Sequence, residues 1–239
     1  MSFYYASLSI ILLASIPTVW EDIKYKKIKN RWMIFGFLSG VLLFLVSYPF
    51  GLISFGYLSK IIVNTLISLL AGFVIWKFGL WPAGDAKFFT LISFLLPLHY
   101  YKETYLNYFP SFVLLLNIFI PFLFFLIFRS LFTFLSAPRA GLETALSNLN
   151  LKNAKKLFFN ITIGLLFYFL MSKLVFRSGP NLFSFFVFFL AFLVINFLLD
   201  IYTNERIRQT IPFAPWIFFG AIATVFIQGS VISFIYKFF

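Results

Sequence analysis

Two aspartates, Asp22 and Asp85, lie where apolar segments meet short basic loops, in a chain of 239 residues that has only seven acidic ones. Asp22 opens the stretch DIKYKKIKN directly after an apolar run, and Asp85 lies in WPAGDAKFF between two apolar runs. Gly84 has no side chain, so it allows an unusual backbone angle or the close approach of another chain. Two carboxyls brought together at a membrane surface can share a proton and activate water for peptide hydrolysis. Asp22 and Asp85 are therefore the candidate catalytic pair.

Each of these residues also has a purely structural interpretation. Asp22 can be an ordinary interfacial residue at a helix end, and Asp85 can be the N-cap of the helix that follows it. Lys87 can bias the electrostatics of the pair. Positions two apart on a helix point away from each other, however, so a lysine that snorkels to the interface is an equal alternative. His99, the single histidine, is expected to be an interfacial anchor beside aromatic residues.

The composition is that of an integral membrane protein. Hydrophobic residues make up 62% of the chain, and the mean hydropathy is +0.99, whereas soluble domains have about 45–50% apolar residues. Apolar runs of about 17–25 residues suit membrane-spanning helices and not barrel strands. The first run lacks a basic start and a small-residue cleavage site, so we expect a retained span. Without cysteine, disulfides, thiolate metal sites and cysteine nucleophiles are excluded, and no metal or cofactor is predicted.

Hydropathy and helix breakers predict an all-helical fold with the N-terminus outside. The expected helices are eight, with six spans as the alternative if one weaker pair lies at the interface: about 2–20, 32–49, 57–77, 86–98, 110–134, 157–175, 182–199 and 212–236. Of the 19 basic residues, this orientation leaves outside only Lys60, Lys102, Lys173, Arg177 and Lys237. The positive-inside rule thus accounts for the net charge of +12 without nucleic acid, and it places both candidate aspartates at the cytoplasmic side.

The longest polar stretch, at about 136–156, contains leucines among polar residues. It is interpreted as a cytoplasmic amphipathic interfacial helix, with a solvated connecting loop as the alternative. It is too small to be an independent domain. We therefore expect residues 1–239 to form one membrane-embedded domain.

The two aspartate segments resemble the motifs of the aspartic prepilin and preflagellin peptidases, membrane proteases of the GxGD class. That family pairs D-x5-I-P-N after its first span with G-x-G-D-x-K before a later one. This chain has Asp22, Ile28 and Asn30 in the first motif, and Gly84, Asp85 and Lys87 in the second. Lys29 replaces the usual proline, and Pro82 stands where the first glycine is expected. Near the C-terminus, IPFAPWIFFG is similar to the family's P-F-x-P stretch.

The resemblance implies an aspartic endopeptidase in the plasma membrane, with its site facing the cytoplasm. Its substrate would be the short basic leader of a type IV pilin-like or archaellin precursor, and its only other expected partner is the lipid bilayer. Because the chain has no C-x-x-C segment, it is similar to the compact, archaeal-style members. Acids on the same side are expected to attract the basic leader, namely Glu21, Asp200 and Glu205.

Three other functions are alternatives to the peptidase. An ion or proton transporter favours acids near the bilayer midplane and repeated halves, neither of which this sequence shows. A catalytically inactive family member in pilus or secretion assembly is kept open by Lys29 and Pro82. A presenilin-like protease lacks its tyrosine-aspartate signature here, because Glu21 precedes Asp22.

Overall fold

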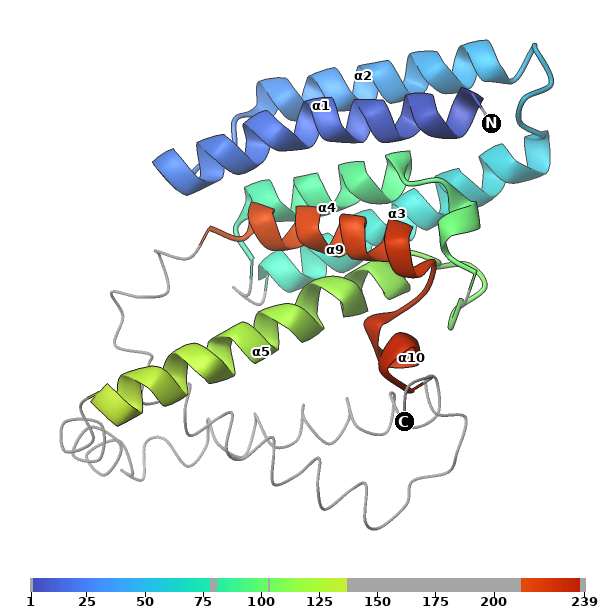
Figure 1. The fold of residues 1–239 in the computed structure, drawn as a ribbon. Helices are drawn as coiled ribbons and strands as arrows, with labels where there is room; N and C mark the ends of the chain where they lie inside the picture. The colour runs from blue at the N-terminus through green and yellow to red at the C-terminus, as the bar shows by residue number, and fades with distance from the viewer. Residues whose placement is uncertain (1, 78–80, 103, 137–211, 237–239) are drawn as a thin grey trace. The chain divides into compact units, whose positions relative to one another are not determined.

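The computed structural model describes residues 2–77, 81–102, 104–136 and 212–236 (Figure 1). Every regular element within these ranges is a helix, as predicted. The elements are α1 (Ser2–Tyr25), α2 (Asn30–Ser47), α3 (Phe55–Lys77), α4 (Ala83–Leu95), the short 3-10 helix η1 (Leu98–Tyr100), α5 (Phe112–Ser136), α9 (Ala214–Ile227) and α10 (Val231–Tyr236). The helices expected at 157–175 and 182–199, and the amphipathic segment at 136–156, fall almost wholly outside the described residues.

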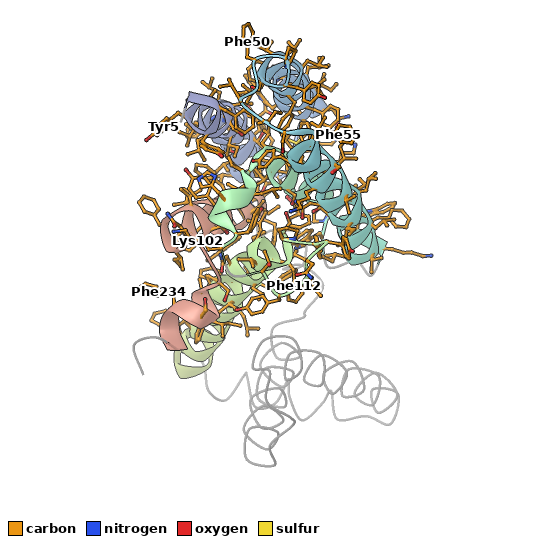
Figure 2. All side chains as sticks on the ribbon, turned by 90° about the vertical axis from the view of Figure 1, so that its right-hand side faces the viewer. Tyr5, Phe50, Phe55, Lys102, Phe112 and Phe234 are labelled. Carbon is orange, nitrogen blue, oxygen red and sulfur yellow. The ribbon has the colours of Figure 1, made fainter. Side chains whose placement is uncertain are left out.

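Three helices in the described ranges, α1 from Phe3 onward, α2 and α3, are long and apolar enough to cross a membrane. Their outward faces carry large apolar side chains that the protein itself does not cover. Tyr5 of α1, and Phe50 in the turn after α2, lie at the periphery in Figure 2, with exposed fractions of 66% and 76%. A surface of this kind suits lipid contact, because lipid tails are as apolar as these side chains. The prediction of a helical membrane protein is confirmed at this level, while the total number of spans and their orientation stay predictions.

The chain groups into two compact units, residues 1–122 with 211–239, and residues 123–210. Of the second unit, only the later part of α5 is described. The first unit holds both candidate aspartates and every contact discussed below.

Helix α1 follows one buried stripe along its length. Its buried positions recur every three or four residues, the spacing that places side chains on one face of a helix; they are Phe3, Ser7, Ile11, Ala14, Ser15, Thr18, Glu21 and Asp22. Asp22 is therefore buried because it continues the packed face of α1. The helix was expected to end near residue 20. It runs to Tyr25, and the turn after it begins at Lys26, which has a left-handed backbone with φ of 52°.

Helix α4 is the most enclosed element of the first unit, and it packs against α1, α2, α3 and α9 (Figure 1). From Asp85 to Leu95, all but two of its residues are buried. At Gly72 of α3, an added Cβ would lie 3.2 Å from the carbonyl oxygen of Ala86, so glycine is what lets α3 approach the start of α4. With only 13 residues, α4 is about 20 Å long. It is not one of the three candidate spans.

Two other predicted helices also had wrong boundaries. The helix expected at 86–98 begins at Ala83, because Pro82 is an extended N-cap that starts the helix, and it ends at Leu95. The helix expected at 212–236 is two helices, α9 and α10. Gln228 ends α9 in a left-handed conformation, and Asn117 of α5 stabilises the break. Its side-chain amide donates to the Gly229 carbonyl oxygen, and its oxygen accepts from the Val231 N–H.

Candidate active site

Asp22 lies in the last part of α1 and is fixed by a residue from the far end of the chain. Its side chain is only 6% exposed. The backbone N–H of Ala214, the first residue of α9, donates a hydrogen bond of 3.0 Å to Asp22 Oδ2. The first N–H groups of a helix have no partner within that helix. The start of α9 therefore supplies a ready donor, which the carboxyl of Asp22 uses.

Asp85 lies in the first turn of α4, two residues after Ala83, so the sequence interpretation of Asp85 as the N-cap was wrong; the N-cap is Pro82. Asp85 is 2% exposed, and its Oδ1 atom has no hydrogen-bond partner among the described residues. Burial raises the pKa of Asp85 to about 8, and the negative charge of Asp22 contributes to this rise. The two carboxyls are thus within electrostatic reach of each other, on helices that pack together.

The remaining residues of the two motifs also meet. Gly84 faces Ile28, and a Cβ added at Gly84 would lie 3.1 Å from Ile28 Cβ. The close approach expected at Gly84 is therefore made by the chain's own α1–α2 loop. The next motif residues along the two segments also meet: Lys87 Nζ donates a hydrogen bond of 3.2 Å to Asn30 Oδ1. Lys87 is exposed, and its partner lies on α2, not on α4.

Glu21 is engaged by the protein's own cations. Its Oε1 accepts a hydrogen bond from Arg31 Nη2 and lies 3.4 Å from Lys29 Nζ. The carboxyl is buried, whereas both cations are more than half exposed. Lys29, where the resembling motif has proline, thus serves to neutralise Glu21. Whether Glu21 also attracts a basic leader stays a prediction, and Glu205 and Asp200 lie outside the described residues.

An aromatic cluster connects the segments that precede α4 and α9. Trp81 is stacked on Phe119 with ring centroids 5.2 Å apart, and its ring lies 5.2 Å from that of Phe213. Phe213 also contacts Phe122 of α5 edge-on, at 4.7 Å. Trp81 comes four residues before Asp85, and Phe213 directly precedes Ala214. Packing in this cluster therefore fixes the backbone next to both carboxyls.

Sequence reasoning missed two contributors to the site. The Ala214 amide has no side-chain signature, although the P-F-x-P stretch that contains it was noted. Trp81 was not singled out, although it stands beside Pro82 in the same short segment. Within the described part of the chain, no three His, Asp or Glu side chains gather closely enough to hold a metal ion.

The fold and the site define a helical membrane protein with two buried carboxyls at adjoining helix ends. Comparison with known protein families narrows this class further. Residues 7–137 match the model of the type IV leader peptidase family. Because the match spans more than half of the chain, the protein belongs to the type IV leader peptidase family. The matched region includes Asp22 and Asp85 and ends before α9. Neither the curated proteins nor the solved structures contain a match to this chain.

Proposed function

We propose that this member of the family is an aspartic endopeptidase with Asp22 and Asp85 as its catalytic pair. Its substrate would be the short basic leader of a type IV pilin-like or archaellin precursor. The cut would be made at the cytoplasmic face of the plasma membrane, where water is available to the site.

The observation that carries this proposal is the residue-by-residue meeting of the two motifs. Asp22 acts electrostatically on Asp85, Ile28 contacts Gly84, and Asn30 accepts a hydrogen bond from Lys87. These contacts join segments more than fifty residues apart in the sequence. A purely structural role would explain one acid at a helix end. It would not explain why two buried acids are brought within reach of each other, since each raises the cost of ionising the other.

The chemistry follows from that cost. Two neighbouring buried carboxyls hold one proton between them, so one is an acid and the other a base. The base removes a proton from water, and the resulting oxygen nucleophile attacks the carbon of the scissile carbonyl. The acid donates its proton to the carbonyl oxygen. Collapse of the tetrahedral intermediate then breaks the C–N bond as the amine leaves with a proton.

Both departures from the family motif are accommodated locally. Pro82 has φ of −61° and an extended ψ of 153°, a conformation that the proline ring favours. Lys29 has an extended backbone as the N-cap of α2, and its ammonium group pairs with Glu21. Neither residue displaces Asp22 or Asp85, which supports a working site over an inactive one.

The test is cleavage of basic-leader peptides by the purified protein in detergent. Asp22→Asn and Asp85→Asn should each lower the rate by about 10²–10⁴-fold or more, the usual contribution of a positioned acid or base. Glu103→Gln is the matched acid-to-amide control, because Glu103 is predicted on the opposite side of the membrane. Its rate should equal that of the unaltered protein.

Activity that survives either aspartate substitution would refute the paired-acid mechanism. Cleavage of leaders with neutral residues in place of the basic ones, at an unchanged rate, would refute the proposed substrate class. Size-exclusion profiles and helix content must match across the variants, so that lost activity is not lost folding.

A further inference from the structure

The two carboxyls have different hydrogen-bond environments. Asp22 Oδ2 accepts a backbone hydrogen bond, whereas Asp85 Oδ1, in a residue 2% exposed, has no donor among the described residues. An N–H donor stabilises a carboxylate more than a neutral carboxylic acid, because the negative oxygen is the stronger acceptor. A buried carboxyl without a donor is stabilised instead by keeping its proton. The surroundings thus distinguish the two acids.

The donor to Asp22 is held rigidly. Ala214 is fully buried at the start of α9. Phe213 before it is anchored in the aromatic cluster, and Pro215 after it has a φ restricted by its ring. The Ala214 N–H can therefore keep its direction toward Asp22 without an ordering cost at the moment of reaction, as electrostatic preorganisation requires.

We propose that the Ala214 amide determines which acid has which role. It stabilises Asp22 as the carboxylate that takes a proton from water, and Asp85, without such a donor, is the acid that protonates the scissile carbonyl. This assignment of catalytic roles rests on the proposed peptidase function. Ala214 is a positioning residue, because its amide contacts Asp22 and not the substrate.

With this assignment, the proton transfers form a closed cycle. Asp22 accepts a proton from water as the water oxygen bonds to the carbonyl carbon, and Asp85 gives its proton to the carbonyl oxygen. Asp22 then passes its new proton to the amide nitrogen as the C–N bond breaks. Asp85 recovers a proton from one hydroxyl of the intermediate as the carbonyl re-forms. Both acids return to their starting states, and one water has been consumed.

The other charged groups around Asp85 do not remove this asymmetry. Helix α9 has no titratable residue between Ala214 and Ile227. Lys87 on α4 is exposed and bonded to Asn30. On α1 and at the start of α2, Glu21 is paired with Arg31 and Lys29, and α3 contributes Lys77 at its last turn. Lys26, four residues after Asp22, is the cation that acts on that carboxyl. The raised pKa of Asp85 agrees with its assignment as the acid.

The protonation states can be measured directly because the chain has only three aspartates, Asp22, Asp85 and Asp200. The full chain would be labelled with ¹³C at the aspartate side-chain carboxyl and studied by NMR in detergent micelles. Single Asp→Asn variants assign the three signals. At about pH 6.5, below the titration of an acid with a pKa near 8, the Asp85 signal should have the shift of a protonated carboxyl. The Asp22 signal should have that of a carboxylate.

Removing the donor tests the role of Ala214. Ala214→Pro deletes the N–H at the first helical position, where proline is well tolerated, and Ala214→Gly is the matched variant that keeps it. The Asp22 signal should move toward the protonated shift in Ala214→Pro and stay in place in Ala214→Gly. Because proline disfavours a helical conformation at Phe213, circular dichroism must show that Ala214→Pro is folded. If it is not, the signals of the unaltered chain still decide the assignment.

A protonated Asp22 beside an ionised Asp85, or two signals with the same shift, would overturn the assignment. An unchanged Asp22 signal in folded Ala214→Pro would overturn the role of the amide. These signals do not depend on turnover. If the two signals differ as expected but the protein cleaves no leader, only the proposed function is refuted. If the protein cleaves leaders but the signals are reversed, only this inference is refuted.

Discussion

Two buried polar regions of the first unit differ in how completely their hydrogen bonds are satisfied. Asn64 of α3 donates to the Ser93 carbonyl oxygen and to Ser111 Oγ, and it accepts from the Ser111 N–H. Asn117 makes three equivalent bonds to Thr224, Gly229 and Val231. At the acid pair, by contrast, the buried Asp85 Oδ1 has no partner among the described residues; beside the Asn64 network, the hydroxyl of Ser93 also lacks one.

The difference separates polar groups that hold the fold from those available for chemistry. A fully satisfied buried network stabilises one arrangement of helices. An unsatisfied buried polar atom costs free energy, and native proteins retain few of them. A carboxyl oxygen without a partner, as at Asp85, is what a site expected to bind water and a peptide would show. The comparison predicts that substitutions in the asparagine networks reduce stability, while those at the acids reduce activity.

The largest effect is expected from Asp85 and pH. Its pKa is raised from 3.8 to about 8 in the folded protein, so between these values the folded state binds more protons than the unfolded state. The free energy of unfolding should therefore fall as pH rises from about 4 to about 8, and level off above. Asp85→Asn should remove this part of the slope, so the variant becomes the more stable protein toward pH 8. Chemical unfolding in detergent across this pH range measures the unfolding free energy of both proteins. Parallel plots of that free energy against pH would contradict the prediction.

The next largest effect is expected in the satisfied network. Asn64→Ala leaves the Ser111 N–H without its buried acceptor and should cost about 2 kcal/mol of unfolding free energy. The matched control is Asn107→Ala, because Asn107 is exposed and its loss should change the unfolding free energy little. Thermal unfolding in detergent compares the two variants. Equal stabilities would show that the network does not hold the fold, and the contrast between the two regions would fail.

A smaller effect is expected at the contact between the two motifs. Gly84→Ala places a methyl group 3.1 Å from Ile28 Cβ, tighter than ordinary contact, so the α1–α2 loop must shift by a few tenths of an ångström. We expect roughly a 10-fold loss of leader cleavage, about 1.4 kcal/mol in the barrier. Adding Ile28→Gly, which removes the Cβ atom that the new methyl group would meet, should restore most of it. Gly56→Ala is the control, because the nearest described atom, Ser54 Oγ, lies 4.0 Å from its added Cβ. A double variant no better than Gly84→Ala would mean that the contact is not the cause.

The smallest effect is expected at the exposed Lys87–Asn30 hydrogen bond. Lys87→Met and Asn30→Ala should each change cleavage by a few-fold at most, since exposed polar pairs contribute under about 1 kcal/mol. If the two residues act through their mutual bond, the double variant should be no worse than either single one. Additive losses in cleavage rate would show that Lys87 acts independently, for example on the charge of the pair.

The sequence predicted the helical fold because long apolar runs have few other solutions in a membrane. Its errors lie at helix ends, where side-chain pattern is weakest. Hydropathy ended the first helix before Glu21, because it scores charged residues as exposed, but the buried stripe continues through Asp22. It also joined α9 to α10, because the left-handed turn at Gln228 depends on hydrogen bonds from Asn117, more than a hundred residues earlier.

For the site, side-chain chemistry was predictable and backbone chemistry was not. The closeness of the Asp22 and Asp85 segments and the tight contact at Gly84 followed from residue types and spacing. The partner of Lys87 was missed because helical spacing relates Lys87 only to other residues of α4, whereas Asn30 lies on α2. Asn64 was missed because one asparagine in an apolar run has no unique partner in sequence. The donor to Asp22 is a main-chain group, and any residue except proline would have supplied it.

The hydrogen bond between Asp22 and Ala214 joins residues 192 positions apart. During synthesis, the helix that carries Asp22 is made among the first, yet its partner emerges from the ribosome only after nearly all of the described helices. A nascent or truncated chain that stops before α9 therefore has both acids but no amide to orient the first. Such a chain lacks the donor that fixes Asp22, so the complete environment of the two acids forms only late in synthesis.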